Sequence, residues 1–122
     1  MNAYSTVPML ENVVYGTASG NYDGSSQDWF SNAVPAASYY AGQGSIQTML
    51  YNLSGFVGVI TIQATLNNLP DQAQWFDISV RGDGITPDSG VTTSTVTGNF
   101  SWVRAHVQGF DSGTITSVSI AY

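Results

Sequence analysis

The near absence of strong helix formers is the feature that most restricts the fold of this chain. None of its 122 residues is Lys, and Glu11 is the only Glu. Both types favour helices, whereas the β-branched and aromatic residues that favour strands are frequent here. Gly, Asn, Asp and Ser interrupt them at short intervals, as in chains with many short strands joined by turns. The sequence therefore predicts an all-β fold.

The length fits one domain, because domains typically hold roughly 100–150 residues. We predict a single antiparallel β-sandwich, jelly-roll-like, over residues 1–122, with a loop-rich arm or interface region at 1–44 and the core strands at 45–122. The N-terminal region could hold a short strand around Trp29–Phe30, but much of it is predicted as loop. The other predicted strands are Asn12–Gly16, Ser45–Leu53, Gly58–Thr65, Gln74–Val80, Gly90–Val96, Asn99–Gln108 and Thr114–Tyr122.

The segment Phe100–Val107 shows the clearest strand alternation. One face presents Phe100, Trp102, Arg104 and His106, and the other presents Ser101, Val103, Ala105 and Val107. We predict that the Val103 face packs on the core and that the Trp102 face meets a second sheet or a partner. The turn residues Gly109–Gly113 predict a hairpin between this strand and Thr114–Tyr122.

Charge excludes several classes of function. Arg81 and Arg104 are the only cations, and eight carboxylates bring the net charge to −6. Binding to nucleic acid requires clustered Lys or Arg that displace counterions, and an anionic membrane surface attracts the same residues. No segment is apolar over the 18 or so residues of a membrane helix. The first 16 residues do not have the pattern of a signal peptide. We therefore expect no nucleic acid and no membrane as partners.

The chain contains few residues of the types that enzymes use for catalysis. His106 is the only His, and there is no Cys, so a Ser-His-Asp triad would have to be built around one residue. The Asp residues lie in turns or at strand ends, where they favour local hydrogen bonds. We expect a chain that is not an enzyme and that needs no cofactor or metal.

Two motifs allow other interpretations. Asp83 and Asp88 share a glycine-rich loop that could supply oxygen ligands to calcium, although solvated turn residues are the favoured interpretation. Arg81-Gly82-Asp83 spells a tripeptide recognised by integrins, but matches of three residues arise easily by chance. Neither motif is assigned a site.

The aromatic residues are candidates for a binding surface. The Trp residues and several Tyr residues could stack on sugars in a carbohydrate-binding module, although core or interface positions are the simpler interpretation. Arg104 lies two residues from Trp102 on one strand face, where the two could form a cation–π pair. The predicted interface residues are Trp29, Phe30, Tyr39, Tyr40, Trp102 and Arg104.

The C-terminal half resembles small structural proteins of tailed bacteriophages, in particular of phages that infect cyanobacteria. The likeness lies in Gly98–Val107 (GNFSWVRAHV) and Gly113–Tyr122 (GTITSVSIAY), and in the preceding Phe56–Thr65 (FVGVITIQAT) and Trp75–Ile78 (WFDI). It covers Phe56 to Tyr122 and consists of strand residues, so it carries no active-site residue over. It implies a β-sandwich component of the virion, either a capsid decoration (cement) protein or a part of the tail, baseplate or fibre.

We therefore expect a phage virion protein that is made in the host cytoplasm. A capsid decoration protein that binds and stabilises the assembled head is the first hypothesis. Its partners would be the major capsid protein or other virion proteins, and it would form a homo-oligomer, with a trimer favoured. A tail, baseplate or fibre component and a carbohydrate-binding β-sandwich module remain the alternatives.

Overall fold

The computed structural model describes residues 6–36, 46–67 and 74–121, and all its strands belong to one antiparallel sheet. None of the described residues forms a helix, and so none forms an apolar helix able to cross a membrane. The predicted all-β antiparallel fold is confirmed. The strands are β1 (Thr6–Val14), β2 (Trp29–Phe30), β3 (Val34–Pro35), β4 (Ile46–Thr65), β5 (Phe76–Arg81), β6 (Asp88–Thr97) and β7 (Trp102–Ala121).

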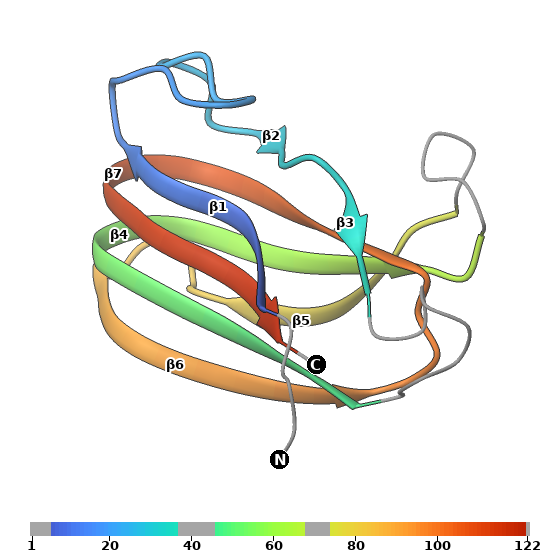
Figure 1. Cartoon of the computed structure of the whole chain (residues 1–122). Helices are drawn as coiled ribbons and strands as arrows, with labels where there is room; N and C mark the ends of the chain where they lie inside the picture. Colours follow the sequence, from blue (N-terminus) through green and yellow to red (C-terminus); the bar gives the residue numbers. More distant parts are fainter. Residues whose placement is uncertain (1–5, 37–45, 68–73, 122) are drawn as a thin grey trace.

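Two strands of 20 residues, β4 and β7, form the centre of the sheet. They pair antiparallel from Thr48↔Ala121 to Thr65↔Trp102, and the register shifts between Asn52 and Val59. Both strands curve back at this point, so the sheet has two halves that lie one in front of the other (Figure 1). The strand pairing shows one antiparallel sheet of seven strands, and the two-layer sandwich with jelly-roll-like topology stays a prediction.

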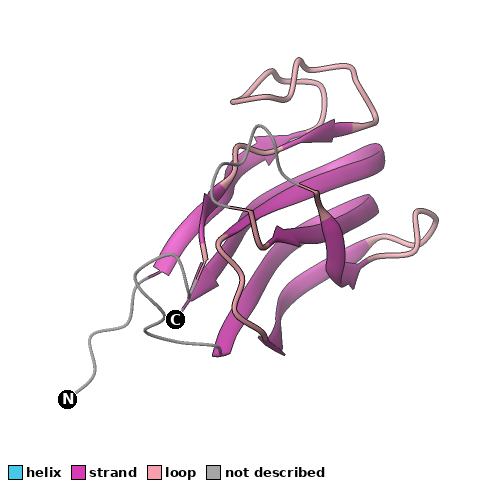
Figure 2. Cartoon of the chain, turned by 90° about the vertical axis from the view of Figure 1, so that its right-hand side faces the viewer, coloured by secondary structure: helices cyan, strands magenta, loops and turns pink. Residues whose placement is uncertain are grey.

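Each half contains one end of both long strands. In the first half β1 and β6 flank the C-terminal part of β7 and the N-terminal part of β4. In the second half β2 and β3 lie beside the N-terminal part of β7, and β5 pairs with the C-terminal part of β4. Figure 2 shows the strands of both halves from the side. The connections β1–β2, β3–β4, β5–β6 and β6–β7 therefore lead from one half to the other, whereas β2–β3 and β4–β5 stay within the second half.

The core lies between the inward faces of the two halves. Strand alternation places Met49, Tyr51 and Leu53 inward from the first half and Ile60 and Ile62 inward from the second, all 0–2% exposed. The Tyr51 hydroxyl lies 2.6 Å from Ser79 Oγ on β5, a hydrogen bond that joins the two halves. Burial raises the pKa of Tyr51, so this hydroxyl stays neutral and able to donate.

The predicted core face is confirmed over residues 103–107, whereas Phe100, predicted on the opposite face, is 8% exposed and belongs to the core. Val103, Ala105 and Val107 are all fully buried, while Trp102, Arg104 and His106 on the opposite face are partly exposed. Alternation over this segment was long enough to separate the two faces.

An aromatic cluster fills the core where the long strands curve. The ring of Phe110 is fully buried there. Its centroid lies 5.0–6.3 Å from those of Tyr15, Tyr22, Trp29 and Phe56. The backbone approach is equally tight, because Gly113 has φ of 90° and a Cβ at this position would lie 2.2 Å from the carbonyl oxygen of Gly55. Only glycine fits that contact.

Several predictions about chain organisation were wrong. Ser45–Leu53 and Gly58–Thr65, predicted as separate strands, are parts of the single strand β4. The segments Asn99–Gln108 and Thr114–Tyr122 do not form a hairpin, because they are the two ends of β7 and each pairs with β4. Residues 6–36 of the expected N-terminal arm contribute β1, β2 and β3, all paired with β7. The first strand covers Thr6–Val14 instead of Asn12–Gly16, whereas the short strand at Trp29–Phe30 is confirmed.

Replacing Phe110 by Ala should remove the centre of the aromatic cluster. Because the ring is fully buried, we expect the free energy of unfolding to fall by about 3–5 kcal/mol. Chemical denaturation measures the change. Val91→Ala, at a residue 62% exposed on β6, is the control and should change stability by less than about 0.5 kcal/mol. Equal losses in the two variants would contradict this description of the core.

Candidate binding face

The outer surface of the second half gathers side chains from four strands or strand ends. Arg104 and His106 point outward from β7, because Val103, Ala105 and Val107 between and beside them point into the core. The register places Gln63 of β4 opposite Arg104 and Phe30 of β2 opposite His106. These pairings bring residues far apart in the sequence onto one surface.

A stack of planar groups forms the centre of this surface. The guanidinium carbon of Arg104 lies 4.2 Å from the ring centroid of Phe30 and 4.4 Å from that of Trp75. The ring of His106 is parallel to Phe30 within 5°, with centroids 4.0 Å apart. Cations over aromatic faces are attracted by the ring quadrupole. The order of the stack is therefore Trp75, Arg104, Phe30 and His106.

Hydrogen bonds fix the edges of the stack. Arg104 Nε donates to Gln63 Oε1 at 2.9 Å, and Gln63 Nε2 donates to Asp77 Oδ1 at 3.1 Å. At the other end, His106 Nε2 lies 2.6 Å from Asp28 Oδ1. We call this surface the aromatic–arginine face, and it consists of Asp28, Phe30, Gln63, Trp75, Asp77, Arg104 and His106.

Partial burial of Arg104 matters for its chemistry. Desolvation lowers its pKa. The ordinary pKa of an arginine lies so far above 7 that Arg104 keeps its charge despite this lowering. The face therefore presents one held cation between aromatic rings, with the carboxylates of Asp28 and Asp77 at either side.

Only some of the predicted interface residues lie on this surface. Phe30 and Arg104 are in contact, and Trp102 follows the same outward alternation, opposite Pro35 of β3. Trp29 does not lie on this surface, because it is 7% exposed and packs on Tyr22 in the core. Tyr39 and Tyr40 lie outside the described residues.

The sequence indicated Trp75 only as one of the Trp residues that could stack on sugars, and it did not single out Gln63. Trp75 precedes β5 and Gln63 lies in the middle of β4, so neither is close to Arg104 along the chain. Only the register of β4 against β7 brings Gln63 to Arg104. Alternation could have placed Gln63 outward, but it could not have named its neighbour.

The two carboxylates proposed as possible calcium ligands, Asp83 and Asp88, both accept hydrogen bonds from groups in or beside their own loop. Asp83 Oδ1 accepts hydrogen bonds from the backbone N–H groups of Ile85 and Thr86, which lower its pKa. Arg81 Nη2 donates to Asp88 Oδ1 at 2.7 Å, and its Nε donates to the other oxygen of that carboxylate. Within the described residues no group of three or more possible metal ligands occurs. With its guanidinium held by Asp88, Arg81 does not present an adhesive tripeptide.

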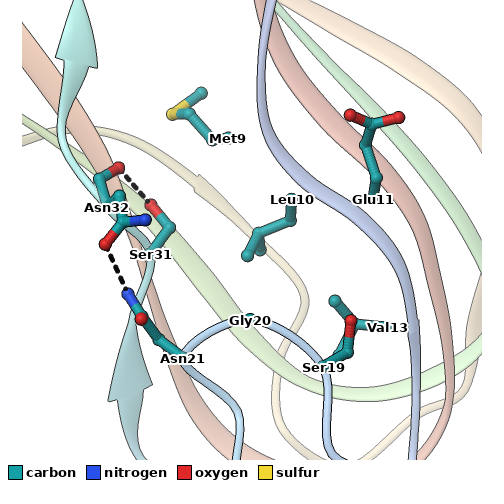
Figure 3. Close-up of a pocket in the computed structure, with 9 residues that line it drawn as sticks. All are labelled: Met9, Leu10, Glu11, Val13, Ser19, Gly20, Asn21, Ser31 and Asn32. Atoms are coloured by element: carbon teal, nitrogen blue, oxygen red, sulfur yellow. Dashed lines mark hydrogen bonds between the residues drawn. The ribbon is translucent and has the colours of Figure 1, made fainter.

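A small hollow lies between β1 and the loop that follows it (Figure 3). Its volume is about 90 Å³, and the hydrogen bond from Asn21 Nδ2 to Asn32 Oδ1 at 2.9 Å forms part of its wall. Ligand pockets usually hold roughly 300–1,000 Å³. This hollow is lined by Met9, Leu10, Glu11, Val13, Ser19, Gly20, Asn21, Ser31 and Asn32. It is too small for a sugar ring, so it is a gap at the edge of the core and not the candidate site.

Searches against models of protein families, against curated proteins and against solved structures found no match for this chain. The resemblance of residues 56–122 to phage structural proteins therefore stays an expectation.

The Arg81–Asp88 pair should make stability depend on pH. Arg81 lowers the pKa of Asp88 below its value in the unfolded chain, so the stabilisation is present above about pH 4–5 and is lost as the pH falls further. We expect Asp88→Asn to lower the free energy of unfolding by about 1 kcal/mol at pH 7 and much less at pH 3. Denaturation at both values measures this. Asp111→Asn, at an exposed position, is the control, and a loss for Asp88→Asn that is the same at both pH values would contradict the prediction.

Proposed function

We propose that this chain is a structural protein of a bacteriophage virion, foremost a capsid decoration protein, and that it binds its virion partner through the aromatic–arginine face. We choose this surface because the guanidinium of Arg104 lies over the rings of both Phe30 and Trp75. The virion assignment itself is supported by the resemblance of residues 56–122. A protein with few charges and neutral polar strands also suits a subunit that must desolvate a large contact area.

The composition of the face favours a protein as the partner. Trp and Arg are enriched among the residues that contribute most to protein–protein binding. Here the stack and the hydrogen bond from Arg104 to Gln63 already hold the side chains in place. Binding therefore loses little additional side-chain entropy, which favours affinity.

The charges of the face indicate what the partner presents. Asp28 is exposed, and the carboxylate of Asp77 lies at the opposite side of the stack. Arg or Lys side chains of the partner can pair with these carboxylates at the rim, while apolar or aromatic groups cover Trp75. If the partner surface exists only in the assembled head, binding stabilises the assembled state by mass action.

Carbohydrate binding is the second candidate, and the exposed part of Trp75 beside Gln63 and Asp77 favours it. A sugar ring needs an open aromatic face with polar groups beside it. Phe30 does not offer one, because Arg104 lies over its ring and His106 stacks on it. One remaining ring supports a sugar platform less well than the whole surface supports a protein contact.

Arg104→Ala and Trp75→Ala should weaken binding to virion particles. We expect each to cost about 2 kcal/mol, or roughly 30-fold in affinity, as for a central interface residue. The measurement is co-sedimentation with empty heads, and in parallel with tails, of the phage that encodes the chain, both prepared without this protein. Arg104→Lys should recover only part of the loss, because Lys keeps the charge without the planar stacking.

Ile85→Ala, at a residue 82% exposed in the loop between β5 and β6, is the matched control and should bind as the parent does. Thermal unfolding confirms that each variant is folded. Binding to tails alone would assign the tail alternative. Binding to heads that is unchanged in Arg104→Ala and Trp75→Ala would exclude this face. No binding to particles, together with glycan binding lost in Trp75→Ala, would replace the proposal by a carbohydrate-binding function.

A further inference from the structure

β6 forms an open edge of the first half of the sheet. It pairs with β4 from Ile46↔Thr97 to Phe56↔Asp88, and in the described part of the chain no strand pairs with its other side. Most of its residues are exposed. In an antiparallel strand the backbone N–H and C=O groups of alternate residues point to each side. Half of the polar backbone groups of β6 are therefore directed away from the sheet.

Natural sheets usually protect such an edge with Lys, Pro, a bulge or an inward charge. Between Gly90 and Thr97 β6 has none of these, and its register with β4 is unbroken over this length. The segment reads Gly-Val-Thr-Thr-Ser-Thr-Val-Thr, which is rich in residues that favour strands. Its backbone is therefore ready to pair with another strand.

The opposite edge of the same half is protected. β1 contains Pro8, a register shift between Pro8 and Leu10, and the charged Glu11. Asn12 has φ of 51°, outside the strand region. A strand added to β1 would meet these irregularities, so the two edges of this half are not equivalent, and pairing of β6 with β1 of another copy is disfavoured.

Charge indicates which partner fits the β6 edge. The net charge of −6 makes two copies repel each other over most surfaces. β4 contains no charged residue, and the single charge of β6, Asp88, is paired with Arg81. A second copy can therefore approach along β6 without bringing unpaired carboxylates together, whereas a cationic partner would gain nothing there.

We propose that two copies of this chain pair antiparallel through β6 about a twofold axis, so that the first halves form one continuous sheet. A twofold interface uses the same patch of both copies. β6 meets that requirement because Thr and Ser occupy most of its length, and Thr–Thr pairs across antiparallel strands are favourable. The inference rests on the edge and charges of β6, not on the proposed function, and it replaces the trimer expected from the sequence by a dimer.

A lysine on β6 tests the pairing. Thr93 is exposed on the outer surface, and twofold pairing would bring the lysines of the two copies of Thr93→Lys close together across the interface. We expect the Kd of the dimer, measured by sedimentation equilibrium, to rise by about tenfold or more, because like charges oppose each other in the interface. Ser117→Lys is the matched control. Ser117 lies on β7 in the middle of the same half, paired with both Glu11 and Asn52, so its lysine changes the net charge equally and should leave the dimer intact.

Hydrogen exchange of the full chain locates the contact. Amides of β6 should be protected at concentrations above the Kd and should exchange faster on dilution, while those of β1 should not change. Thermal unfolding verifies that Thr93→Lys folds, and Thr95→Lys provides a second variant on the same surface. A monomer up to about 1 mM, a trimer, or a dimer that both lysine variants leave intact would overturn the proposal. A dimer that stays intact in Arg104→Ala, a change on the second half, separates this inference from the proposed function whether or not particle binding falls.

Discussion

The antiparallel pairing of β4 with β7 is the interaction on which the rest of the structure depends. The two strands pair over nearly their whole length, and every other described strand is bonded to one of them. Because both curve at the same level, one continuous ladder supplies the centre of both halves. The tight backbone contact of Gly113 with Gly55 and the buried Phe110 ring occupy this curve.

This central pair also decides which side chains reach the surface. Alternation along β7 sends Val103 inward and Arg104 outward, and the register with β4 then gives Arg104 its hydrogen-bond acceptor in Gln63. The edge strand β2 adds Phe30 to the same surface through its pairing with His106. The aromatic–arginine face is therefore a consequence of register, and a shift of one residue would turn Arg104 into the core.

The sequence predicted the parts of the fold that depend on local pattern. The lack of helix formers predicted an all-β chain, and the alternation near Val103 predicted its buried face. The hairpin at Gly109–Gly113 was wrong because glycines mark a bend within a long strand as readily as a turn between two strands. Trp29 and Phe30 could not be separated either, because a strand of two residues is too short to show a period. Their opposite positions follow only from pairing with Val107 and His106.

The two halves of the sheet have different outer surfaces, so each half offers a different kind of contact. The first half is neutral around an open edge at β6, whereas the second half holds Arg104 between aromatic rings with carboxylates on either side. Self-association at the first surface would leave the second surface free in each copy. A dimer joined in this way would carry two aromatic–arginine faces, and on a repetitive particle the second contact would form at a high effective concentration. Modest affinity at each face would then suffice for stable attachment, which is consistent with a face that contains a single cation.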